Sequence, residues 1–178
     1  MINDIERVLL SEEELKKIIK RLGKEITEDY KDKNLLVVSV LKGSVMVMAD
    51  LLREIKIPCR IDFMSVSSYG SGTKTTGSVK IIKDLDIDLA GYDLLIVEDI
   101  LDSGVTLSSL KEILLTRDPA SVKICTLLDK PERRKADIKA DYIGAQVPDA
   151  FVVGYGLDYD EKYRNLPFVG ILSPKVYE

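Results

Sequence analysis

Three short apolar runs constrain the fold most strongly, because each is rich in β-branched or leucine residues and each lies next to a helical pattern. The runs are LLVVSVL (35–41), LLIVED (94–99) and VKICTLLD (122–129). Continuous apolar runs of this length are typical of strands that are buried on both faces of a sheet. Helices between successive strands imply right-handed βαβ units. The sequence therefore predicts an α/β fold with a mainly parallel central sheet flanked by helices.

Helical patterns occupy the intervals between these runs. Ser11 precedes Glu14 by three residues, as a capping box requires, and apolar residues then recur at helical spacing as far as Ile26. Two further helices are predicted, one over 43–55 and one that carries Leu107, Leu110 and Leu114 on one face. Additional strands are predicted from near Arg60 and over 78–84, 141–146, 151–156 and 168–172. The 178 residues suffice for one domain with a substantial core, so 1–178 is predicted to be a single domain.

Composition excludes several classes of function. The chain has no histidine, so a Ser-His-Asp triad and histidine metal sites are excluded, and acid–base chemistry must come from carboxylates, lysine or tyrosine. A net charge of -4 argues against general affinity for nucleic acid or membranes. Cys59 and Cys125 lie in apolar segments and are expected to be buried free thiols. The N-terminus lacks a signal-peptide pattern and no apolar run reaches the ~18 residues of a membrane span, so a cytoplasmic location is expected.

Parallel sheets of this class bind ligands beyond the carboxyl ends of their strands. The predicted order of strands brings four segments to that edge: 41–44, 98–106, 129–130 and 155–158. We therefore expect a binding cleft there.

Small polar residues follow the strand at 94–99, where a helix is predicted to begin. Ser103, Gly104 and Thr106 offer backbone N–H groups and hydroxyls at a helix N-terminus, which favours a phosphate. A plainer interpretation remains open, in which Asp102 or Ser103 simply caps the helix.

Two adjacent carboxylates, Glu98 and Asp99, precede this helix start. Carboxylates accept hydrogen bonds from hydroxyls and bind hard cations, but they repel phosphate. A ribose 5-phosphate with free hydroxyls suits both features. The alternative is a solvated strand end without a ligand. The sequence contains no P-loop motif and no complete dinucleotide-binding fingerprint.

The string VEDILDSGVTL (97–107) resembles the phosphoribosyl-pyrophosphate (PRPP) signature of the type I phosphoribosyltransferases. The strings LKGS (41–44), SSYGS (67–71), LLDK (127–130) and FVVGYGLDYDEKYRNLP (151–167) narrow the resemblance to the hypoxanthine-guanine branch of that family. The resemblance extends over essentially the whole chain. It implies the type I phosphoribosyltransferase fold, with a small hood formed by the chain-terminal segments and a flexible flap loop in the polar segment 67–77. From the residues alone, this segment could equally be the tip of a hairpin.

The resemblance also implies an activity. The 5-phosphoribosyl group of PRPP would pass to hypoxanthine or guanine in purine salvage, giving IMP or GMP plus pyrophosphate, with Mg²⁺ as cofactor. It further implies a homodimer or homotetramer. The apolar helix segment MVMADLL fits a dimer contact in this family and fits plain core equally well.

Roles transfer to individual positions by resemblance. Asp102 would be the general base beside the purine N7. The PRPP ribose and 5-phosphate would be bound by Glu98, Asp99, Asp102, Ser103, Gly104, Val105 and Thr106. Pyrophosphate would be bound by Lys42, Gly43 and Arg164, with a cis peptide between Leu41 and Lys42.

The remaining roles concern the base, the metal and the flap. The purine would be bound by Lys130, Phe151, Val152 and Asp158, the metal by Glu98, Asp99 and Asp158, and Ser68 and Tyr69 would lie on the flap. From the residues alone, a solvated charge is favoured for Lys130 and a core position for Phe151. Arg164 alone fits a surface ion pair with Asp160 or Glu161.

Two positions depart from the family pattern: Ser103 stands where many relatives have Thr, and Val105 where some have Lys. Neither removes a required group. Two alternatives to the salvage enzyme remain, a PRPP-sensing regulatory protein without turnover and an enzyme that prefers xanthine or a pyrimidine.

Overall fold

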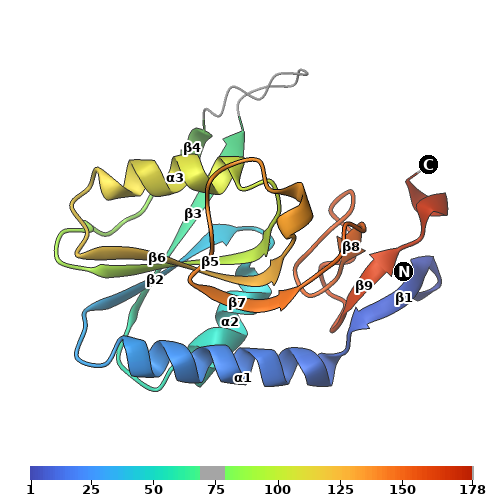
Figure 1. The fold of residues 1–178 in the computed structure, drawn as a ribbon, viewed down its shortest axis with the longest axis horizontal. Helices are drawn as coiled ribbons and strands as arrows, with labels where there is room; N and C mark the ends of the chain where they lie inside the picture. Colours follow the sequence, from blue (N-terminus) through green and yellow to red (C-terminus); the bar gives the residue numbers. More distant parts are fainter. Residues whose placement is uncertain (69–78, 178) are drawn as a thin grey trace.

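A mainly parallel sheet forms the centre of the molecule in the computed structural model, which describes residues 1–68 and 79–177 (Figure 1). Its six strands lie in the order β4-β3-β2-β5-β6-β7. The parallel strands are β2 (Leu35–Leu41), β3 (Arg60–Ser68), β5 (Asp93–Leu101), β6 (Ser121–Asp129) and β7 (Tyr142–Gln146). The edge strand β4 (Val79–Lys83) pairs antiparallel with β3. The predicted sheet is confirmed, and β2 has the bounds that its apolar run indicates.

Helices cover both faces of this sheet, as Figure 1 shows. Helices α1 (Glu12–Asp29) and α2 (Val45–Glu54) lie on one face, and α3 (Val105–Leu115) lies on the other. Strand β5 is buried on both faces, which is why its sequence is apolar without alternation. Leu95 and Val97 pack in the core cluster with α1 and α2, whereas Leu94 and Ile96 pack in the cluster with α3.

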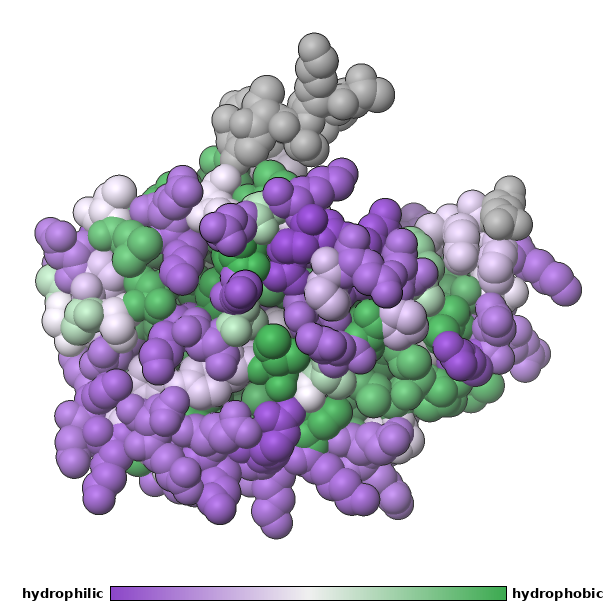
Figure 2. Space-filling model, viewed as in Figure 1, coloured by the Kyte–Doolittle hydropathy of each residue, from purple (hydrophilic) through white to green (hydrophobic). Residues whose placement is uncertain are grey.

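Helix α1 begins as the sequence predicts. Ser11 Oγ accepts a hydrogen bond from the Glu14 N–H at 3.2 Å, and a Glu14 carboxylate oxygen accepts one from the Ser11 N–H at 2.8 Å. The capping box is therefore confirmed. The outer face of α1 is charged and gives the molecule a hydrophilic lower edge (Figure 2).

A second, three-stranded antiparallel sheet stands beside the central one. Its order is β1-β9-β8, with β1 at Ile5–Leu10, β9 at Val169–Leu172 and β8 at Val152–Val153. It joins the two ends of the chain, which confirms the predicted hood. The sequence analysis did not predict β1, and it made β8 too long. Gly154 (φ 96°) turns the chain, and its N–H bonds to the carbonyl of Leu157, so pairing with β9 ends there.

Short 3₁₀ helices complete the fold, at Ile2–Asp4, Pro131–Arg133 and Pro174–Val176. The part of the chain that the structure describes contains no helix long and apolar enough to span a membrane. Both cysteines are free, but only Cys125 is buried, so the expectation of burial is wrong for the half-buried Cys59.

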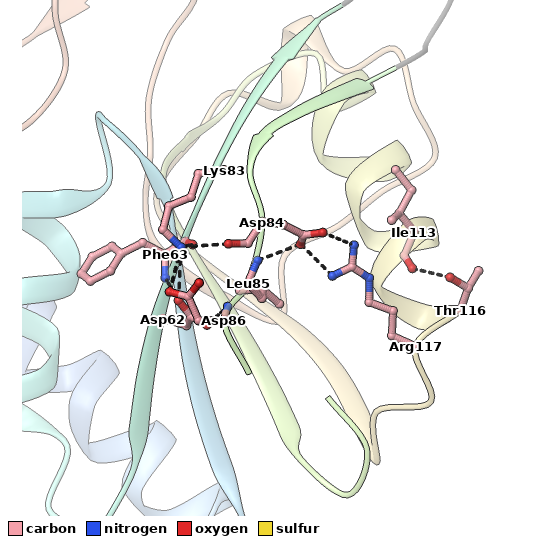
Figure 3. Close-up of polar contacts among 9 residues, drawn as sticks. All are labelled: Asp62, Phe63, Lys83, Asp84, Leu85, Asp86, Ile113, Thr116 and Arg117. Atoms are coloured by element: carbon pink, nitrogen blue, oxygen red, sulfur yellow. Dashed lines mark hydrogen bonds and ion pairs between the residues drawn. The ribbon is translucent and has the colours of Figure 1, made fainter. Parts of the chain in front are cut away.

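A polar network fixes the β4 edge of the central sheet (Figure 3). Arg117, just beyond α3, donates two hydrogen bonds to Asp84 at 2.7 and 2.9 Å. Lys83 donates to the Phe63 carbonyl at 3.1 Å, and the buried Asp62 accepts from the Asp86 N–H at 2.8 Å. These contacts join β3, β4 and the end of α3. They hold the strand whose last residue, Ser68, reaches the site described next.

Candidate active site

The loop after β2 lies against two other segments of the sheet edge. The peptide bond between Leu41 and Lys42 is cis, as the resemblance implies. A Cβ atom on Gly43 would lie 1.8 Å from Asp99 Oδ2, and one on Gly156 would lie 2.0 Å from the Gly43 carbonyl oxygen. The backbone therefore approaches both neighbours as closely as glycine allows. The structure thus brings together the segments 41–44, 98–106 and 155–158, three of the four that were predicted to meet at the carboxyl ends of the strands.

Ser44 secures this loop from below. Its buried hydroxyl donates to the Val40 carbonyl at 2.6 Å and lies 2.6 Å from the buried Ser39 hydroxyl. The sequence analysis missed this pair. A serine inside the apolar run 35–41 was the available signal, because a buried hydroxyl needs a hydrogen-bond partner.

Lys42 and Arg164 share one carboxylate. Lys42 Nζ lies 3.0 Å from one oxygen of Glu161, and Arg164 Nη2 lies 3.2 Å from the other. Arg164 also pairs with Asp158 at 2.9 Å and donates to the Gly156 carbonyl at 2.8 Å. The alternative ion pair of Arg164 with Glu161 is thus confirmed, but Arg164 is half-buried. The two predicted pyrophosphate ligands lie together, with Glu161 as their shared counter-ion.

The start of α3 has no conventional cap. Gly104 occupies the N-cap position with φ 76°, and it has no side chain with which to cap the helix. The Val105 N–H reaches only the Ser103 hydroxyl, at a long 3.5 Å. The plainer interpretation is therefore supported for Ser103, whose side chain bonds the first turn, although so long a hydrogen bond makes a weak cap.

A cavity of about 190 Å³ opens at this helix start. Its lining includes Glu98, Asp102, Ser103, Gly104 and Thr106. Ser68 reaches the same place, because its hydroxyl lies 3.0 Å from that of Thr106. Tyr69 lies outside the described residues. The structure thus groups five of the seven predicted ribose-phosphate ligands around one small cavity, whereas Asp99 and Val105 do not line it.

Glu98 and Asp99 are not a solvated strand end. They lie inside β5, which continues to Leu101, two residues beyond the predicted strand, and both are half-buried. Burial raises the pKa of Glu98 well above its usual value, and the neighbouring Asp99 charge adds to this. Burial also raises the pKa of Asp99, to about 6, although hydrogen bonds from backbone N–H groups such as that of Ile100 oppose the rise. Hydroxyl donors or a cation would stabilise their charged forms.

Asp99→Asn is expected to stabilise the metal-free protein by about 1–2 kcal/mol at pH 8. The native pKa of about 6 exceeds the usual 3.8, so the native state binds more protons than the unfolded state between these values. Stability therefore falls as pH rises from about 4 to 6, and the full cost is present above that range. Asparagine does not ionise and avoids the cost.

Urea unfolding at pH 8 and pH 4, with chelator present, measures this effect. The gain should shrink towards zero at pH 4, and the exposed Asp137→Asn should show no gain at either pH. An equal gain at both values would contradict the assignment of the raised pKa.

A second cavity, of about 400 Å³, adjoins the carboxyl end of β6. Its lining includes Lys130, Phe151, Val152 and Asp158, which are the four predicted purine ligands. Lys130 is only 4% exposed and donates to the Ala150 carbonyl at 2.9 Å, so it is not a solvated charge. Phe151 is 40% exposed, so it is not a core residue.

Asp102 lines both cavities. One of its carboxylate oxygens, Oδ1, is buried and has no hydrogen-bond partner among the described residues. The nearest cation is Arg133, whose Nε lies 3.7 Å from this oxygen. A buried oxygen without a donor is unfavourable and marks a place where a ligand can donate.

Arg134 holds the backbone beside Asp102. Its guanidinium donates to the carbonyls of Asp102 at 3.0 Å and Ile138 at 2.7 Å, and it pairs with the buried carboxylate of Asp129. The sequence analysis missed Arg134 because it lies in the charged run DKPERRK. Asp129 at the end of a buried strand was the available signal, since a buried carboxylate needs a partner.

Glu98 and Asp99 fit a magnesium site that is completed by substrate phosphates better than one formed by protein side chains alone. Among the described residues, no three Asp, Glu, Cys or His side chains converge to hold a metal by themselves. Mg²⁺ usually keeps several waters and binds through one or two carboxylates together with substrate phosphates. Glu98 and Asp99, whose charged forms are disfavoured by burial, suit that arrangement.

An acidic strand end, a weakly capped helix start and an adjoining cavity with a buried lysine therefore lie together at this edge of the sheet. The chain belongs to the family of the phosphoribosyl transferase domain, whose model matches residues 8–160. It is 59% identical over 178 residues to the hypoxanthine-guanine phosphoribosyltransferase of Bacillus subtilis (strain 168), covering 100% of this chain and 99% of that protein. It is 55% identical over 177 residues to the protein of the same name from Staphylococcus aureus (strain Mu50), covering 99% of each.

Solved structures agree with this assignment. A crystal structure of a hypoxanthine phosphoribosyltransferase from Staphylococcus aureus superposes with a TM-score of 0.98 at 55% sequence identity, covering 100% of this chain and 97% of that one. The expected type I phosphoribosyltransferase fold is confirmed.

Proposed function

We propose that this protein transfers the 5-phosphoribosyl group of PRPP to hypoxanthine or guanine, forming IMP or GMP and pyrophosphate in purine salvage. The observation that carries the proposal is the position of Asp102. It lines both the cavity at the phosphate-type helix start and the cavity that contains Lys130, with one oxygen lacking a donor. A group that bridges ribose and base during transfer must lie in such a place.

The sugar phosphate would occupy the smaller cavity. Its 5-phosphate would accept hydrogen bonds from the backbone N–H groups of residues 103–106, where the helix dipole favours negative charge. Glu98 and Asp99 would accept from the ribose hydroxyls. Their charge would also favour the cationic, oxocarbenium-like sugar of the transition state.

The leaving pyrophosphate would lie against the loop after β2. Lys42 and Arg164 carry the positive charge there and share Glu161 as a counter-ion. Pyrophosphate would replace this carboxylate as their partner. Gly43 would let the backbone approach the phosphates without a side chain in the way.

The purine would occupy the larger cavity. Lys130 would donate to the 6-oxo group, Val152 would offer backbone hydrogen bonds to the base edge, and Phe151 would stack on the ring. Asp102 would accept the proton of the ring nitrogen that attacks the sugar.

We further propose Mg²⁺ as cofactor, held by PRPP together with carboxylates from the set Glu98, Asp99 and Asp158. When bound, the ion would neutralise charge on the pyrophosphate as it leaves. Arg164, which contacts Asp158, would orient that carboxylate.

We also propose a cytoplasmic homodimer or homotetramer. One face of the segment MVMADLL packs in the core, since Val47, Met48 and Leu51 are buried. Val45 and Met46 on the same helix are 37% and 38% exposed and offer apolar area to a second copy. Sedimentation equilibrium measures the subunit number.

A substrate panel tests the proposed function directly. Purified protein receives PRPP and Mg²⁺ with hypoxanthine, guanine, xanthine, adenine or uracil, and nucleotide formation is followed by chromatography. Turnover should be fastest with hypoxanthine and guanine. Preference for xanthine or uracil would contradict the proposed substrate, and absence of turnover with every base would contradict the proposed reaction.

Lys130→Met is expected to raise the KM for hypoxanthine roughly 10- to 100-fold, because a hydrogen bond from a charged donor is lost while the volume is kept. The KM for PRPP should stay within about twofold. Steady-state kinetics with each substrate varied in turn measures both constants. An unchanged KM for hypoxanthine with a raised KM for PRPP would show that Lys130 contributes to binding PRPP and not the purine.

A further inference from the structure

Three aromatic rings cluster where the end of the chain meets the larger cavity. Phe151 and Tyr177 are stacked, with ring centroids 5.2 Å apart and planes 28° apart. Tyr159 approaches Phe151 edge-on, at 5.5 Å and 88°, and lies 6.3 Å from Tyr177. Stacked and edge-to-face pairs are both favourable aromatic arrangements, so each ring restricts the orientation of the others.

The backbone fixes Tyr177 in this place. The Leu172 N–H donates to the Phe151 carbonyl at 2.8 Å, which joins β9 to the segment that carries Phe151. The Ser173 N–H then donates to the Asp4 carbonyl at 2.8 Å, and the Tyr177 N–H closes the last 3₁₀ turn on Pro174 at 3.1 Å. The turn therefore returns the chain over Phe151, rather than leaving its end free in solvent.

Tyr177 also faces the cavity. It lines the same 400 Å³ volume as Phe151, Lys130 and Asp102. Phe151 and Tyr177 are each 40% exposed, although they stack on each other. Phe151 and Tyr177 therefore both contribute exposed aromatic area to this cavity. The family resemblance gives a role to Phe151 but none to Tyr177.

We propose that Tyr177 is a positioning residue for the purine base. Its ring holds the plane of Phe151 and closes the cavity on the side of the chain end, so that an incoming bicyclic base meets a preformed aromatic wall. This inference rests on the proposed function, because it requires a purine in the larger cavity. The phenol oxygen is not needed for it, since the contact runs through the ring.

Steady-state kinetics of Tyr177→Ala tests the inference. The KM for hypoxanthine should rise roughly three- to tenfold, as expected for the loss of an aromatic stacking partner. The KM for PRPP and kcat should stay within about twofold, because Tyr177 does not line the ribose cavity. Tyr177→Phe should behave as the unsubstituted protein, and Tyr177→Leu, which keeps apolar volume without a ring, should lie between Phe and Ala.

Two measurements separate positioning from general loss of structure. Lys175→Ala, an exposed change in the same terminal turn, should leave all constants unchanged. Calorimetric binding of GMP should weaken in Tyr177→Ala by about the same factor as the hypoxanthine KM rises.

The contradicting results are equally specific. An unchanged hypoxanthine KM in Tyr177→Ala would overturn the inference, as would equal increases in both KM values. A lowered hypoxanthine KM would also overturn it, since the ring would then compete with the base. Lack of turnover in the unsubstituted protein would instead overturn the proposed function, so the two failures are distinguishable.

Discussion

Asp102→Asn is expected to lower kcat by roughly 10²–10⁴-fold, the usual contribution of general acid–base catalysis. The amide keeps the size of the side chain but cannot accept a proton from the purine nitrogen. The KM values for PRPP and hypoxanthine should change much less, because the backbone and Arg134 still hold residues 101–102 in place. Pre-steady-state and steady-state assays of IMP formation measure kcat.

Asp160→Asn provides the matched control for this prediction. Asp160 is an exposed acid that pairs with Lys162 at 3.0 Å and lines neither cavity. Its variant should retain normal turnover. Near-normal kcat in Asp102→Asn would remove Asp102 from the role of general base.

Gly43→Ala is expected to lower kcat/KM for PRPP roughly 10- to 100-fold, in line with the cost of forcing extra volume into a well-packed place. The added methyl would lie 1.8 Å from Asp99 Oδ2, so the loop and that carboxylate cannot both keep their positions. Both belong to the proposed PRPP site. The effect should therefore appear in the kinetics of PRPP much more strongly than in binding of hypoxanthine.

Gly91→Ala is the control for a glycine at a distance. No atom lies within 4 Å of its added Cβ, although its φ of 78° makes the change mildly unfavourable. It should reduce thermal stability slightly and leave the kinetics unchanged. A normal kcat/KM for PRPP in Gly43→Ala would show that the close approach of this loop to Asp99 has no part in PRPP binding.

The centre of the sheet was predictable because β2 and β5 are buried on both faces. Leu94 to Val97 are apolar at every position, so the run is clear without knowing which side chain faces which helix. Strand β1 was not predictable in this way. It is largely exposed and, among the described strands, pairs only with β9 near the other end of the chain, so its sequence IERVLL carries no clear alternation.

The site divides along a similar line. Ser103, Gly104 and Thr106 would bind the proposed phosphate through their own backbone and lie in one short string, so local sequence indicates them. Glu161 and Arg134 matter because of partners that folding brings to them. Glu161 pairs with Lys42, 119 residues away in the sequence, and Arg134 donates to the carbonyl of Asp102, 32 residues away. Such contacts leave no local pattern. Both residues looked like ordinary surface charges.

Burial of two acids in β5 gives the fold a local cost that the proposed ligands would relieve. The raised pKa of Asp99, about 6, means that its charged form is disfavoured until a cation or hydroxyl donors arrive. The stability gain expected for Asp99→Asn and the loss of PRPP binding that would accompany it have the same physical cause. Stability and ligand binding therefore make opposite demands on this carboxylate.

A crystal structure of the protein with GMP tests the central claim most directly. The account predicts the 5′-phosphate on the backbone N–H groups of residues 103–106, the ribose hydroxyls on Glu98 and Asp99, and the guanine beside Lys130 with Asp102 at its N7. Well-ordered nucleotide bound at another place, with the turn after β5 empty, would contradict it.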